Sequence, residues 1–294
     1  MSSEDAPTTR PLPDVERVAP GAWRLEAAVA TLPPFDTVNT YVIAHSGVAV
    51  VVDPGGERSE AADATRRTIA LAGATLKAIV LTHTHADHLA GVDRLLEGER
   101  DVAVYAHPRE LQRLDPAWRA TGLAHGRRLT VGDEVVETVH TPGHSPGHIA
   151  LWLSTQRLLL AGDLVAGAGS VWIGLPEGDV GEYLESLARA AALEPAVIAP
   201  GHGPVRHDGA LVLHEARAHR LARERGVLAA LRIGPLDLSA IRRALYPDLD
   251  AAIVDHAERS VLAHLRKLMR ERRVMHVGTD ERGPFDLAPG GGRD

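Results

Sequence analysis

The stretch Thr82-His83-Thr84-His85-Ala86-Asp87-His88 carries three histidines and one aspartate within six residues of a 294-residue chain. The apolar run Leu76–Leu81 before it predicts a buried strand. In an extended backbone, side chains two residues apart point to the same side, so His83 and His85 can hold one metal ion together. The stretch therefore predicts most of a metal site at the end of a strand.

The second half of this stretch turns into a predicted helix over Leu89–Leu96. Asp87 and His88 lie at the turn, where they would face a second ion next to the first. The alternative is a polar strand-helix corner with scattered histidines. We favour the metal site because matching pieces follow downstream in the order that such a site needs.

Three downstream motifs each place one imidazole or carboxylate after an apolar run. They are Thr141-Pro142-Gly143-His144, Ala161-Gly162-Asp163 and Pro200-Gly201-His202-Gly203-Pro204. The preceding runs, Val135–Val139, Leu158–Leu160 and Ala196–Ala199, predict strands. Glycines in the turns permit sharp bends and leave room for an ion. Zinc accepts imidazole nitrogen and carboxylate oxygen at about 2.0–2.2 Å, so these loops would converge at one sheet edge.

This motif set resembles the metallo-β-lactamase superfamily, whose fold is an α/β, αββα sandwich with the metals at one sheet edge. Asn39–Ile43 and Val48–Gly56 resemble the first hairpin of that family and its aspartate-containing turn. The resemblance spans roughly residues 20–207. It implies that the chain is a metal-dependent hydrolase.

The resemblance also implies which side chains hold the two ions. The first ion would be held by His83, His85 and His144. The second would be held by Asp87, His88 and His202, with Asp163 bridging both. Zinc is favoured by the imidazole-rich set, although iron and manganese also suit histidine and carboxylate ligands.

Two further residues belong to the expected surroundings of the ions. Asp53 would orient a ligand from outside, a role that such carboxylates commonly have. His148 is interpreted as structural or as a partner of a ligand. The other ten histidines are expected on the surface or in packing: His45, His107, His125, His140, His207, His214, His219, His256, His264 and His276.

The chain has no cysteine. The thiolate that the commonest true β-lactamases of this superfamily use at the second metal is therefore missing. Asp87 must replace it, as in the hydrolases and nucleases of the superfamily, and antibiotic hydrolysis is not expected as the native activity. An absence of cysteine also excludes a disulfide framework.

Soon after His202 the sequence pattern changes from one typical of strands and turns to one typical of helices. Predicted helices at Leu213–Leu231, Ala240–Leu245 (capped by Ser239) and Ala251–Arg273 precede strands at Val274–Val277 and Pro284–Leu287. This order resembles a winged-helix module. We predict a catalytic domain over 15–207, a winged-helix-like domain over 208–288, and flexible tails at 1–14 and 289–294.

This tail narrows the resemblance to the β-lactamase-like protein 2 branch of the superfamily. Members of that branch include single-strand-preferring endoribonucleases, and related members are thioesterases that release acyl chains from carrier proteins. Ala86 stands where the ribonuclease member carries a bulkier basic residue. The resemblance thus leaves two substrate classes open.

Charge and hydropathy give weaker indications. Residues 206–276 carry 14 Lys and Arg against 9 Asp and Glu, a balance of +5, in a chain of net charge −7. The basic cluster over Arg266–Arg273 could meet phosphates, but a solvated helix face is the favoured interpretation. Winged helices also serve as dimerisation modules, so a homodimer is a second possibility. No apolar run approaches the ~20 residues of a membrane span, and Met1–Pro7 does not resemble a signal peptide, so a cytoplasmic location is expected.

The expected mechanism uses a hydroxide that bridges the two metals and attacks a carbonyl carbon or a phosphorus. Asp87 and Asp163 are the candidate catalytic residues, and Asp87 is both ligand and candidate proton acceptor. A metal-bound water or His148 would protonate the leaving group.

We favour a thioester or ester substrate with a small-molecule acyl group. The apolar channel for its acyl tail would be lined by Trp172, Ile173 and Leu175 of the Val165–Pro176 loop. The alternative substrate is single-stranded RNA, for which the arginines nearest the motifs in sequence are Arg94, Arg109 and Arg206. An alternative from a different functional class is a DNA-binding regulator with a vestigial metal site.

Overall fold

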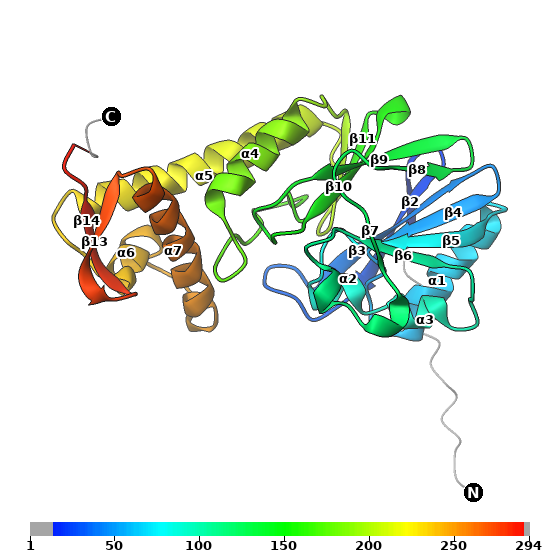
Figure 1. The fold of residues 1–294 in the computed structure, drawn as a ribbon, viewed down its shortest axis with the longest axis horizontal. Helices are drawn as coiled ribbons and strands as arrows, with labels where there is room; N and C mark the ends of the chain where they lie inside the picture. The colour runs from blue at the N-terminus through cyan, green and yellow to red at the C-terminus, as the bar shows by residue number, and fades with distance from the viewer. Residues whose placement is uncertain (1–13, 291–294) are drawn as a thin grey trace, which may run out of the picture.

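The computed structural model describes residues 14–290, which form two layered sheets and a C-terminal helical unit (Figure 1). One sheet has seven strands in the order β1 to β7. These are β1 (Val15–Ala19), β2 (Ala22–Ala28), β3 (Thr37–His45), β4 (Val48–Val52), β5 (Thr75–Val80), β6 (Ala103–Ala106) and β7 (Thr121–Gly122). The other has the order β12-β11-β10-β9-β8. Its strands are β8 (Arg128–Val131), β9 (Glu134–His140), β10 (Ile149–Leu153), β11 (Leu158–Gly162) and β12 (Val197–Pro200).

Three apolar clusters separate four layers. One cluster lies between the two sheets, and a second lies between the seven-stranded sheet and helices α1 (Ser59–Leu71) and α3 (Val92–Leu96). The third lies between the five-stranded sheet and helices α4 (Val180–Ala191) and α5 (Gly209–Leu231). The predicted αββα sandwich is therefore confirmed.

Strand β10 shows why both faces of a sheet are apolar here. Leu151 and Leu153 pack between the sheets, whereas Ala150 and Trp152 point to the helical side. Successive side chains of a strand alternate between the faces, and both faces of this strand are covered. The result is a continuous apolar run in place of an alternating one.

The C-terminal unit contains α6 (Leu238–Leu245), α7 (Val254–Arg270) and a two-stranded wing of β13 (Val274–Asp280) and β14 (Gly283–Leu287). Its core also includes the second half of α5, whereas Val212 and Leu213 in the first half of α5 pack into the catalytic core. Short 3₁₀ turns at Leu111–Arg113, Pro116–Trp118, Ser154–Gln156 and Ala251–Ile253 complete the elements.

Two local predictions were wrong. The helix expected over Leu89–Leu96 is split into α2 (Ala86–Leu89) and α3, because the Gly91 N–H donates to the Pro54 carbonyl at 2.7 Å. A Cβ at Gly91 would lie 2.9 Å from that oxygen. The cap of α6 is Asp237, whose Oδ1 accepts the Ala240 N–H at 2.7 Å, and not Ser239.

No helix within residues 14–290 combines the length and apolar character needed to cross a membrane. The tails predicted to be flexible fall almost entirely on residues 1–13 and 291–294, outside the described part of the chain, and stay a prediction.

Candidate metal centre

Strand ends bring the predicted ligands to one edge of the sandwich. Strand β5 leads into the histidine-rich stretch, and β9, β11 and β12 lead to His144, Asp163 and His202. Strands β9, β11 and β12 run in the same direction, so their carboxyl ends share an edge. Two backbone hydrogen bonds join the sheets there, from Ile149 N–H to the Thr82 carbonyl (2.8 Å) and from Asn39 N–H to the Gly201 carbonyl (2.7 Å).

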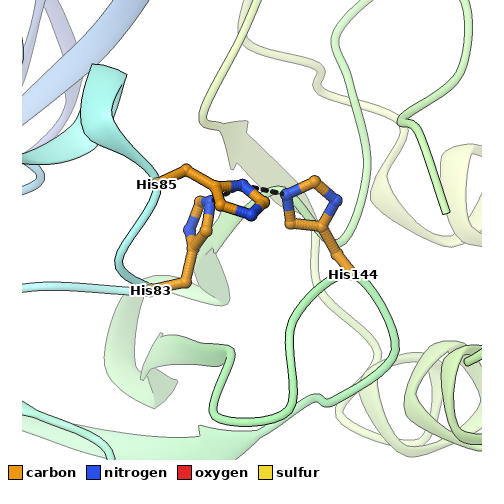
Figure 2. A group of neighbouring side chains, drawn as sticks. All are labelled: His83, His85 and His144. Atoms are coloured by element: carbon orange, nitrogen blue, oxygen red, sulfur yellow. Dashed lines mark hydrogen bonds between the residues drawn. The ribbon is translucent and has the colours of Figure 1, made fainter. Parts of the chain in front are cut away.

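His83, His85 and His144 form the first cluster (Figure 2). The Nδ1 atom of His85 lies 3.0 Å from Nε2 of His83 and 2.9 Å from Nε2 of His144. His83 and His144 are buried, and His85 is partly exposed. Three ring nitrogens thus converge on one point.

The outer nitrogens of these rings are already occupied. His144 Nδ1 donates to the Trp172 carbonyl at 2.7 Å. His83 Nδ1 lies 3.1 Å from the Thr82 hydroxyl, which itself donates to Asp53 and therefore accepts from His83. In a neutral imidazole one nitrogen carries the proton and the other a lone pair, so both Nε2 lone pairs point inward. A cation between these two lone pairs interacts with both, whereas a single proton on His85 can hydrogen-bond to only one of them.

Asp87, His88 and His202 form the second cluster. Nε2 of His202 lies 3.4 Å from Asp87 Oδ2. Again the outer nitrogens are engaged: His88 Nδ1 bonds Asp53 Oδ2 at 2.9 Å, and His202 Nδ1 donates to the Thr37 carbonyl at 2.6 Å. The Nε2 atoms of both rings are left to face inward.

Asp163 lies between the two clusters. Its Oδ2 is 3.4 Å from His144 Nε2 and 3.6 Å from His202 Nε2, and its Oδ1 is 3.5 Å from His88 Nε2. Burial opposes its ionisation, but the histidines around it, His88 first, hold the pKa of this carboxyl well below its usual value. Within residues 14–290, His88 Nε2 and Asp163 Oδ1 are buried without a hydrogen-bond partner. Buried polar atoms are normally paired, so these orphans fit metal ligands.

Asp53 and His148 lie behind the candidate metal ligands. Asp53 accepts from the Thr82 backbone N–H (2.7 Å) as well as from His88. His148 bonds the Thr141 hydroxyl through Nδ1, and its Nε2 accepts the Asp163 backbone N–H at 2.9 Å. Burial lowers the pKa of His148 to about 3. Because Nε2 accepts a backbone N–H, the one ring proton of His148 lies on Nδ1 and is engaged with the Thr141 hydroxyl, which argues against His148 as the proton donor to the leaving group.

Gly162 and Gly201 make room for the cluster. A Cβ on Gly201 would lie 2.3 Å from Asp163 Oδ1 and 2.8 Å from a ring carbon of His88. A Cβ on Gly162, at φ +48°, would lie 2.7 Å from His148 Nε2. Both glycines are therefore required by close approach to the side chains that form the site.

Sequence reasoning missed Glu110, which follows β6 and is fully buried. Its carboxylate accepts from the Thr84 hydroxyl (2.5 Å), the Ser145 hydroxyl (3.0 Å) and the Gly147 N–H (2.7 Å). It thereby ties the loop of His83 and His85 to the loop of His144. Its local sequence looks like any surface glutamate, so no signal marked it.

A cavity of about 720 Å³ opens onto five of the candidate metal ligands: His85, Asp87, His144, Asp163 and His202. It lies between the catalytic sandwich and the C-terminal unit, and its walls include Trp172, as expected. Ile173 and Leu175 belong to the core beneath α4 instead, so that part of the prediction was wrong. The arginines nearest the motifs in sequence, Arg94, Arg109 and Arg206, bond the Glu57 carbonyl, the Pro146 carbonyl and the Asp208 carboxylate. The arginines in the cavity wall are Arg220 and Arg223 of α5.

Comparison with known families agrees with this geometry. The sequence profile of the Metallo-beta-lactamase superfamily matches residues 33–202. The chain belongs to this superfamily. The profile of the Beta-lactamase associated winged helix domain matches residues 238–282, confirming the predicted winged helix.

The similarity to several known proteins covers most of this metallo-β-lactamase-fold chain. The Beta-lactamase-like protein 2 homolog of Caenorhabditis elegans is 27% identical over 79% of this chain and 79% of its own. An Atrochrysone carboxyl ACP thioesterase of Passalora fulva is 28% identical over 75% of this chain and 64% of its own. The crystal structure of a metallo-beta-lactamase family protein from Thermus thermophilus is 27% identical, with a TM-score of 0.74, and covers 92% of this chain and 100% of its own. The chain is a metallo-β-lactamase-fold hydrolase.

Proposed function

We propose that this chain is a dinuclear metal-dependent hydrolase of carboxylic thioesters or esters. The observation that carries the proposal is the cavity, whose walls beside the metal centre are largely apolar: Leu32, Phe35, Trp172, Leu249 and Ile253. Pockets for small molecules usually measure roughly 300–1,000 Å³ and combine apolar walls with a few polar groups. The similarity to a thioesterase supports the same substrate class.

His83, His85 and His144 would hold one ion, and Asp87, His88 and His202 the other, with Asp163 between them. Imidazole and carboxylate ligands favour zinc and also accept iron or manganese. Such ions, when bound, would lower the pKa of a coordinated water toward neutrality and polarise a carbonyl group.

The protein's own residues would orient and protect the reacting groups. Asp53 and the Thr37 carbonyl fix the rings of His88 and His202, so their lone pairs cannot turn away. Asp87 Oδ2 accepts from the Thr31 hydroxyl at 2.7 Å. Its Oδ1 receives no hydrogen bond within residues 14–290, and this oxygen is the candidate proton acceptor. Phe35 stacks on His202 with ring centroids 5.3 Å apart and keeps bulk water from that side.

Single-stranded RNA is the alternative substrate. The basic cluster over Arg266–Arg273, the candidate phosphate contact, is mainly paired within the protein: Lys267 contacts Glu224, Arg270 contacts Asp179, and Arg273 contacts Glu224. Cations held in ion pairs are poor phosphate clamps, so the structure favours the small acyl substrate. The same pairing argues against the DNA-binding regulator.

Hydrolysis assays on the metal-loaded chain test the proposal. Acyl thioesters and single-stranded RNA are compared for the native chain and for His85→Ala and Asp163→Ala, with metal content measured in each. We expect thioester cleavage that falls to background in both variants, together with loss of bound metal. Cleavage of RNA alone would overturn the proposed substrate, and full activity after loss of metal would overturn the mechanism.

A further inference from the structure

Two arginines of α5 line the cavity together with the metal ligands. Arg220 is 4% exposed, donates to the Val171 carbonyl and lies over the Tyr183 ring at 5.3 Å. Arg223 is half-buried and lies over the Tyr246 ring at 4.1 Å. Neither guanidinium forms an ion pair with any carboxylate within residues 14–290.

Other cationic side chains that face the interior of the C-terminal unit form ion pairs with carboxylates. Lys267 lies 2.6 Å from Glu224 and 2.8 Å from Glu271. Arg273 lies 3.4 Å from Glu224, and Arg242 lies 3.9 Å from Glu258. The C-terminal unit therefore pairs its buried charges, and the cavity wall is the exception.

The unpaired charges make this part of the cavity electropositive. Burial lowers the pKa of Arg220, and no carboxylate within residues 14–290 offsets it. The nearby His264 has a pKa lowered to about 3, first by burial and then by Arg220 and Arg223. A charge removed from water without a partner is costly, so a guanidinium kept at a cavity wall points to an anionic ligand.

We propose that Arg220 and Arg223 form an anion subsite that binds a carboxylate or phosphate of the substrate, away from the bond that is hydrolysed. This inference rests on the proposed function. Guanidinium groups bind both anions through paired N–H donors. The anion would be either a second carboxylate on the acyl part or a phosphate on the thiol part. The apolar walls between would accommodate the chain that joins the anion to the thioester.

Matched substrates test the subsite in the full-length, metal-loaded chain. Glutaryl and pentanoyl N-acetylcysteamine thioesters differ only by a terminal carboxylate, and pentanoyl coenzyme A adds phosphates on the thiol side. The variants are Arg223→Ala and Arg223→Lys, because replacing the buried Arg220 risks misfolding. Arg225→Ala is the control, since Arg225 is exposed on the same helix and is not in the cavity wall.

We expect the ratio of kcat/KM for an anionic substrate to that for the neutral one to fall roughly 10- to 100-fold in Arg223→Ala. Arg223→Lys retains part of the preference, and Arg225→Ala leaves the ratio unchanged. A fall for the glutaryl thioester assigns the anion to the acyl part, and a fall for the coenzyme A thioester assigns it to the thiol part. An unchanged ratio for both, or an effect on RNA cleavage alone, overturns the subsite.

Calorimetric binding of glutarate and of coenzyme A separates this inference from the proposed function. If no thioester is cleaved but one of these anions binds and Arg223→Ala abolishes the binding, the subsite stands and the thioesterase proposal fails. If thioesters are cleaved while neither anion binds and the ratio of kcat/KM is unchanged, the thioesterase proposal stands and the subsite fails.

Discussion

Asp53 illustrates how a residue that need not touch a metal can set its affinity. Its carboxylate bonds both Thr82 and the Nδ1 of His88, and this fixes which nitrogen of His88 faces the cluster. The residue adopts φ +48°, a conformation that asparagine tolerates better than most residues. Asp53→Asn therefore removes the negative charge and one of the two acceptor oxygens without straining the backbone, so the bonds to Thr82 and His88 cannot all be kept.

We expect Asp53→Asn to weaken metal binding at the second cluster about 10- to 100-fold, because partners behind metal-ligating histidines commonly have effects of this size. Competition with a chelator measures the affinity. Asp133→Asn is the matched control, since that exposed aspartate bonds the Ser46 hydroxyl and lies near His45. Equal affinities in the two variants would contradict the role of Asp53.

Glu110 stabilises the loops that carry His83, His85 and His144. Glu110→Ala leaves the Thr84 and Ser145 hydroxyls and the Gly147 N–H without their acceptor. Each unpaired buried donor costs about 1–3 kcal/mol, so for three donors we expect a loss of at least about 3 kcal/mol in the free energy of unfolding. Denaturant titration measures it. Glu110→Gln keeps an accepting oxygen and should lose less, and a loss no larger than that of the exposed Glu99→Ala would disprove the role.

At the scale of elements, the sequence predicted what depends on neighbours in the chain. Apolar runs located β5, β9, β11 and β12 closely, and each ligand followed directly from a strand end. Glu110 was missed because its partners lie 26 to 37 residues away. Arg220 and Arg223 were missed for the same reason: α5 returns to the metal loops only in the folded chain. Such contacts leave no local pattern to read.

The packing of α7 against α5 contains a pH-sensitive group. His264 is fully buried, and both its ring nitrogens lack a hydrogen-bond partner within residues 14–290. Burial, with Arg220, Arg223, Lys267 and His219 nearby, lowers its pKa from 6.5 to about 3. Between these values the unfolded chain binds a proton that the folded chain does not, so stability falls as the pH falls below about 6.5.

We expect His264→Leu to remove this dependence. Relative to the variant, the native chain should lose about 2 kcal/mol between about pH 7.5 and pH 5, since each pKa unit corresponds to about 1.4 kcal/mol. The variant should also be more stable at the higher pH, because leucine leaves no unpaired polar atoms. Denaturant unfolding at both pH values measures the difference, with the exposed His214→Leu as control. Parallel losses in all three proteins would refute the assignment.

At the scale of the whole molecule, α5 joins the catalytic sandwich to the winged helix. Its Val212 and Leu213 fill the catalytic core, and its Val227, Leu228 and Leu231 fill the C-terminal core. Trp172 adds a second link, because its carbonyl accepts from the candidate ligand His144 and its indole N–H donates to the His256 carbonyl of α7 at 2.9 Å. The C-terminal unit thus supports the candidate metal centre through Trp172.

This shared helix predicts that both units unfold in one cooperative transition. All four tryptophans, Trp23, Trp118, Trp152 and Trp172, lie in the catalytic part of the chain, so their fluorescence reports on that part and, through Trp172, on its contact with α7. Far-ultraviolet circular dichroism is dominated by the long helices, which lie largely at the C-terminal end. Coincident transitions by the two probes are the test of two-state behaviour.

Leu265→Ala perturbs only the C-terminal core, where Leu265 is fully buried. Such a truncation costs about 2–5 kcal/mol, and we expect the fluorescence and dichroism midpoints to fall together. Leu211→Ala, at an exposed position of α5, should shift neither. If Leu265→Ala lowered the dichroism midpoint and left the fluorescence midpoint in place, the winged helix would unfold independently. The metal centre would then not need it for stability, and its contribution would be confined to the cavity wall.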